Sequence, residues 1–95
     1  MLALMQAVME KSIFTDEYEV LLHLLRETRQ GARITQAKLA EILGQSQSFV
    51  SKVEIGERRL DVIQLRTICH SLGTTLSQFV SKLEERLRKT EKRKR

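Results

Sequence analysis

The chain has no proline and no tryptophan, and its 95 residues include only four glycines and one cysteine. Without proline, no helix is interrupted by a missing backbone donor. Aromatic residues make up only 4 % of the chain, and no segment alternates between apolar and polar residues as a half-buried strand does. Most of the abundant residue types favour helices. We therefore expect one all-α domain.

Signals for disulfides, metals and membranes are also missing. Cys69 has no second cysteine to pair with and matches no metal-ligand spacing with His23 or His70, which fits a cytoplasmic protein. The apolar residues 1–9 lack a preceding basic segment and a cleavage site, and they are too few to span a bilayer. We expect no signal peptide, membrane contact, metal or cofactor. Residues 1–14 would form an N-terminal extension, either a frayed end or a docked helix.

Charge is concentrated at the C-terminus. The chain has a net charge of +5, but residues 86–95 contain seven basic residues against one acidic residue, which is +6, so the remainder sums to −1. Overall charge is thus weak evidence for nucleic-acid binding. The basic tail, residues 88–95, is a solvated end, a non-specific phosphate contact or a contact for an acidic protein.

Capping residues mark five helices. Thr15 would cap the first helix, which Gly31 would end, and the caps of the other four would be Thr35, Ser46, Asp61 and Thr75. Gln64 and Gln78 lie three residues after the last two caps, as in a capping box. The last helix is long, and the whole domain would span residues 15–87.

Residues 35–56 are the most informative stretch. Two short helices are joined by a turn that begins at Gly44, and Ala40 is small where the helices would cross, which is the pattern of a helix-turn-helix. At about 100° per residue, the second helix places polar side chains on one arc and Val50 and Val53 on the opposite, core-facing side. The polar side chains can pair with base edges; they are Gln47, Ser48, Ser51 and Lys52.

The order and spacing of several segments resemble the Xre/Cro-type, lambda-repressor-like helix-turn-helix family. These segments are LLR (24–26), ITQAKLA (34–40), GQSQSFVSKVEIG (44–56), ERRLD (57–61) and LG (72–73). The resemblance covers about residues 16–83 and implies a five-helix DNA-binding domain, here with an extended C-terminal helix. It also implies that the helix over 47–55 reads the major groove of double-stranded DNA.

The resemblance assigns roles to individual residues. Gln36 matches a glutamine that binds a phosphate and supports the first base-reading residue, which would be Gln47. Arg26 and Glu54 match a buried salt bridge between the first and third helices. We expect phosphate contacts from Gln36, Lys38, Ser46, Arg58 and Arg59. Phe49 departs from the pattern and would either pack against the core or contact a thymine methyl group.

A single reading helix covers too few base pairs for useful specificity, so we expect a homodimer on a pseudo-palindromic operator. In the last helix, Leu76 and Phe79 would complete the core, whereas Leu83 and Leu87 continue the apolar stripe. These two leucines would form the dimer interface or fold back on the N-terminal segment.

The sequence therefore predicts a transcriptional regulator, most simply a repressor or autoregulator. No nucleophile–base pair or phosphate-binding glycine loop is present in the sequence, so we do not expect an enzyme. An alternative is an antitoxin that binds its own promoter and a toxin partner. A third is a helix-turn-helix scaffold that has lost DNA binding, against which the polar arc around Gln47 argues.

Overall fold

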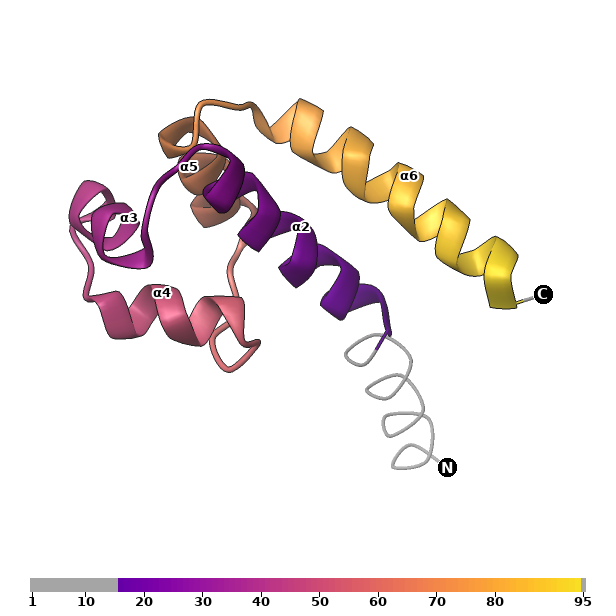
Figure 1. Ribbon diagram of the computed structural model, residues 1–95, viewed down its shortest axis with the longest axis horizontal. Helices are drawn as coiled ribbons and strands as arrows, with labels where there is room; N and C mark the ends of the chain where they lie inside the picture. The colour runs from indigo at the N-terminus through magenta and orange to yellow at the C-terminus, as the bar shows by residue number, and fades with distance from the viewer. Residues whose placement is uncertain (1–15, 95) are drawn as a thin grey trace.

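The computed structural model of the protein describes residues 16–94, and this range contains five α-helices and no strand (Figure 1). The helices are α2 (Tyr18–Gly31), α3 (Gln36–Leu43), α4 (Gln47–Glu54), α5 (Val62–Ser71) and α6 (Leu76–Lys94). The expected all-α, five-helix fold is thus confirmed for the described part of the chain. The predicted N-terminal extension and the cap at Thr15 lie outside it.

Side-chain caps begin the helices as expected. The hydroxyl groups of Thr35 and Ser46 accept hydrogen bonds from backbone N–H groups three residues later, at 3.1 Å each. Asp61 and Gln64 form a complete capping box at the start of α5. The second predicted box is only half formed, because the side-chain oxygen of Gln78 accepts from the Thr74 hydroxyl at 3.0 Å. Local patterns therefore fix where four of these helices begin.

The end of α2 differs from the prediction. Gly31 is the last residue of the helix rather than the left-handed residue that follows it, and Arg33 takes the positive φ of 60°. The N–H of Ala32 continues the helical pattern by donating to the carbonyl oxygen of Thr28 at 3.1 Å. The helix thus stops two residues later than a glycine stop at Gly31 would place it.

All five helices contribute to one core. The buried apolar residues that form it are Leu24, Leu25, Leu39, Ala40, Val50, Val53, Ile68, Cys69, Leu72 and Phe79. Burial raises the pKa of the Cys69 thiol, which keeps this side chain protonated and in the role of an apolar core residue.

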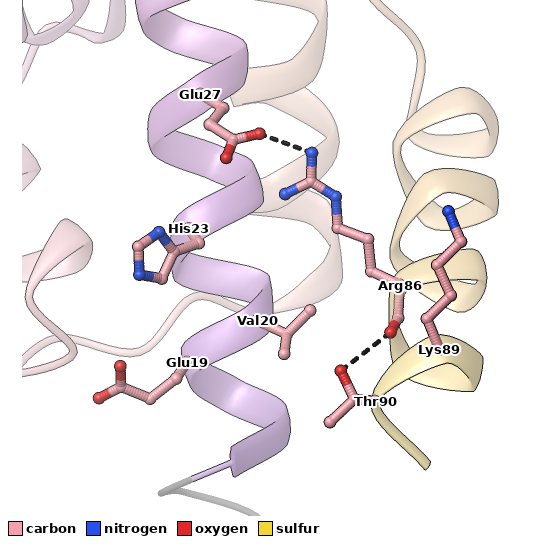
Figure 2. Close-up of a pocket in the computed structure, with 7 residues that line it drawn as sticks. All are labelled: Glu19, Val20, His23, Glu27, Arg86, Lys89 and Thr90. Carbon is pink, nitrogen blue, oxygen red and sulfur yellow. Dashed lines mark hydrogen bonds and ion pairs between the residues drawn. The ribbon is translucent and has the colours of Figure 1, made fainter. Parts of the chain in front are cut away.

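Helix α6 packs beside α2 and then extends beyond the domain (Figure 1). Figure 2 shows the outer cleft between the two helices, which the ion pair between Glu27 and Arg86 bridges at 2.5 Å. This pairing lowers the pKa of Glu27. The helix runs without interruption past residue 87, where we expected the tail to begin. No helix in the described residues is long and apolar enough to cross a membrane.

Candidate nucleic-acid interface

Helices α3 and α4 form the two-helix unit that the sequence predicts. Gly44 ends α3 with a φ of 65°, a conformation that costs glycine little, and Ser46 then caps α4. Ala40 is 3 % exposed, so the small side chain lies in the tightly packed interior beside the turn. The short turn and the packing together hold α4 in a fixed orientation against α3.

The two sides of α4 have opposite character. Val50 and Val53 are buried in the core, at 3 % and 2 % exposure. Gln47, Ser48 and Lys52 are exposed, and Ser51 is half-buried beside them. The residues predicted to read bases therefore lie together on the side of α4 that faces away from the core, and Ile55, which is 58 % exposed, follows them at the C-cap of the helix.

A buried carboxylate joins the end of α4 to two other helices. Glu54 is 2 % exposed, and its two oxygens accept hydrogen bonds from Arg29 of α2, at 2.5 Å from Nε and 3.1 Å from Nη2. Arg29 is itself buried, and its Nη1 donates to the carbonyl oxygen of Ile34 just before α3. A third donor is Gln36, the first residue of α3, whose Nε2 lies 2.9 Å from Oε1 of Glu54.

Hydrogen bonding keeps this carboxylate ionised. Burial by itself raises the pKa of Glu54, but the hydrogen bonds from Arg29 and Gln36 and the charges of Arg29 and Arg26 outweigh it. The pKa is therefore below its ordinary value. A buried charge is tolerated here because it is paired and its oxygens accept several hydrogen bonds.

The predicted ion pair between Arg26 and Glu54 is present, but the buried partner of Glu54 is Arg29, so the expectation that Arg26 forms a buried pair is corrected. Arg26 does approach Glu54, with Nε 3.7 Å from Oε1, but its side chain is 43 % exposed. Helical spacing accounts for the difference in burial between the two arginines, and this signal was present in the sequence. Arg29 follows Leu22 by seven residues and Leu25 by four and shares their buried stripe, whereas Arg26 is rotated toward solvent.

The residues expected to bind phosphate lie around this unit, and their side chains make different contacts within the protein. Gln36 is half-buried and uses one amide hydrogen for Glu54. Lys38 is exposed and 3.5 Å from the carboxylate of Glu41, a weak surface pair. The Ser46 hydroxyl caps α4.

Two arginines of the loop after α4 stack on aromatic rings. Arg58 lies over Phe49 with 5.3 Å between the guanidinium carbon and the ring centroid, and Arg59 lies over Tyr18 at 4.3 Å. Both arginines remain exposed, and stacking still leaves N–H groups at the edge of a guanidinium to donate. Phe49 itself is partly buried against the core, the first of the two alternatives left open for it.

Comparisons with known proteins agree with this geometry. The helix-turn-helix family matches residues 25–79. A solved structure described as an XRE-family like protein from Pseudomonas syringae pv. tomato is 51 % identical, with a TM-score of 0.73, over 79 % of this chain and 92 % of that one. The clp gene regulator ClgR from Corynebacterium glutamicum is 23 % identical, with a TM-score of 0.71, over 82 % and 83 % of the two chains, and shows a shared fold. No curated protein matches the chain.

Proposed function

The chain belongs to the Xre/Cro-type helix-turn-helix family of DNA-binding transcriptional regulators, and from that premise we propose that it is a sequence-specific repressor or autoregulator that reads the major groove with α4. ClgR is named a gene regulator, and neither similar structure is named for catalysis. We also propose that this protein has no enzymatic activity and acts on DNA in the cytoplasm.

The observation that carries the proposal is the two-sided character of α4. Its core-facing valines are buried, while Gln47, Ser48 and Lys52 are exposed. The side chains of these three residues neither cap a helix nor pack in the core. An amide can pair with both edge groups of adenine, and hydroxyl and ammonium groups can donate to bases or phosphates. We assign the base contacts to these three residues and Ser51.

Phosphate contacts would fix the register of α4 on the duplex. The first turn of α3 offers Gln36 and Lys38, and Ser46 and the loop arginines Arg58 and Arg59 flank the two ends of α4. The Glu54 cluster supports this arrangement, because it ties Gln36 to the last residue of α4. The hydrogen bond to Glu54 therefore holds Gln36 in a defined position relative to α4.

We further propose that the protein binds a pseudo-palindromic operator as a dimer, with half-sites one helical turn apart. The contact expected at Leu83 and Leu87 stays a prediction. Leu83 packs against the core of its own chain and Leu87 is half-buried, so part of this stripe already has an intramolecular partner.

Selection of binding sites from random DNA, followed by Gln47→Ala, tests the proposal. The substitution should weaken binding by about 1–3 kcal/mol at the base pair that Gln47 reads and leave the melting temperature unchanged. Gln45→Ala is the matched control, since Gln45 is an exposed glutamine in the turn before α4 and should not set base preference. A Gln47→Ala protein that prefers the same sites with the same affinity would exclude α4 as the reading helix.

A further inference from the structure

Two half-buried aromatic rings lie next to the loop that follows α4. Of the three aromatic residues in the described part of the chain, Phe79 is fully buried, whereas Tyr18 and Phe49 are only partly covered. Tyr18 is the first residue of α2, and the guanidinium carbon of Arg59 lies 4.3 Å from the centre of its ring. Arg58 lies over Phe49 of α4 in the same way, at 5.3 Å. Rings on two different helices thus hold adjacent residues of one loop.

The backbone of this loop is held in place as well. The N–H groups of Glu57 and Arg58 both donate to the carbonyl oxygen of Lys52 in the last turn of α4, at 2.9 and 3.1 Å. At the start of the loop, a Cβ added to Gly56 would lie 3.2 Å from Cδ1 of Leu22 in α2. The loop therefore packs directly against α2 and is tied to the end of α4.

An arginine that is already held in place loses little freedom when it binds a phosphate. A long side chain has many rotamers, and ordering it on DNA offsets part of the energy of the contact. A guanidinium over an aromatic face is attracted to the ring and keeps N–H donors at its edge, where phosphate oxygens can accept them. The two rings can therefore favour DNA binding without touching DNA.

We propose that Tyr18 and Phe49 are positioning residues for DNA binding, because their rings hold the guanidinium groups of Arg59 and Arg58 in place for the phosphate backbone. This inference rests on the proposed DNA-binding function and on its phosphate contacts. It gives a role to Phe49, which departs from the family pattern. It also brings α2 into the interface, since none of the residues that we assign to DNA contacts lies in that helix.

Tyr18 gives the cleaner test, because Phe49 also packs against the core. Tyr18→Leu removes the ring and keeps an apolar side chain, whereas Tyr18→Phe keeps the ring. Arg59→Gln removes the charge, and a fourth protein combines Arg59→Gln with Tyr18→Leu. Each protein is titrated onto a duplex with the selected site at several salt concentrations, and melting temperatures verify folding.

Tyr18→Leu should weaken binding about two- to fivefold, the factor that corresponds to a cation–π contact at an exposed site. Tyr18→Phe should bind like the parent. Arg59→Gln should weaken binding at least as much and reduce the slope of log affinity against log salt by about 1. In the Arg59→Gln protein, Tyr18→Leu should cause no further loss of affinity, because the ring acts only through the guanidinium.

An equal loss from Tyr18→Leu with and without Arg59 overturns the proposal, because the ring would then act independently of the arginine. Unchanged affinity in Tyr18→Leu or in Arg59→Gln overturns it as well. Phe49→Leu and Arg58→Gln form a second cycle, which decides the role of Phe49 by the same criteria.

The failure of this inference is distinguishable from the failure of the proposed function. All of these substitutions should leave the preferred site unchanged, whereas Gln47→Ala should change it. A selected site that Gln47→Ala alters, together with additive losses in both cycles, would keep the function and exclude the positioning role. If selection from random DNA yields no site, the proposed function fails and this inference with it.

Discussion

At the scale of single residues, Glu54 connects three helices of the domain. Its carboxylate accepts from Arg29 of α2 and from Gln36 of α3 while its own backbone ends α4. Removal of Glu54 or of Arg29 would leave the charge of the other residue buried and unpaired. Gln36 is also a residue for which we propose a phosphate contact, so under that proposal Glu54 affects both stability and DNA affinity.

Arg29→Ala should lower the free energy of unfolding by about 3 kcal/mol or more, because it leaves the Glu54 carboxylate buried and unpaired. Arg26→Ala is the matched control and should cost less than about 1 kcal/mol, since Arg26 is substantially exposed and lies 3.7 Å from Glu54. Urea denaturation of both variants measures the difference. Equal losses would show that the two arginines share the carboxylate equally.

Acidification should lower the stability of the parent protein through the same carboxylate. Because the folded-state pKa of Glu54 lies below the ordinary value of about 4.3, its stabilising contribution is complete above that value. The contribution is lost as pH falls through the folded-state pKa. In Arg29→Ala this part of the pH dependence should shrink, which the same denaturation series reports.

At the scale of helices, the four glycines have different backbone requirements. Gly44, Gly56 and Gly73 have positive φ values, whereas Gly31 lies within α2 and Arg33 takes the left-handed position after it. Glycine in a helix costs stability relative to alanine, while at a positive φ it avoids a steric cost. Position in the helix, and not residue type alone, decides the effect of a substitution.

Gly31→Ala should therefore stabilise the protein by about 0.5–1 kcal/mol, since an added Cβ meets nothing within 4 Å. Gly44→Ala should instead destabilise it by about 1 kcal/mol, because the φ of 65° penalises a Cβ. Thermal melts of the two variants give the signs. A destabilised Gly31→Ala protein would mean that Gly31 is the left-handed stop that the sequence suggested.

At the scale of the whole molecule, the basic C-terminal residues and the proposed base-reading helix α4 lie at separate ends. Figure 1 shows the C-terminal end of α6 on the side of the molecule opposite to α3 and α4. Most of the net positive charge is in residues 86–95, whereas the exposed face of α4 has a single charged residue, Lys52. Of the three roles left open for the basic tail, we predict that it adds attraction to DNA without selecting its sequence.

Deletion of residues 88–95 should weaken binding to all DNA sequences alike and flatten the dependence of affinity on salt. The preferred site should stay the same. Fluorescence titrations with the selected site and with unrelated DNA over a range of salt concentrations measure both quantities. A changed site preference would assign base reading to the tail.

The amino-acid sequence by itself determined the helices, the caps that begin four of them, the helix-turn-helix and the exposed polar side of α4. These features depend on contacts within about four residues and on the helical period, both of which can be read along the chain. The family resemblance added the family and the five-helix fold. The buried apolar residues of α4 and α5 follow from the same periodicity.

Only the tertiary structure decided which side chains meet across helices. It made Arg29, rather than Arg26, the buried partner of Glu54 and tied Gln36 to that pair. It also stacked Arg58 and Arg59 on aromatic rings and packed Leu83 against the core. One helical turn separates Arg26 from Arg29, so the choice depends on how α2 is rotated against α4.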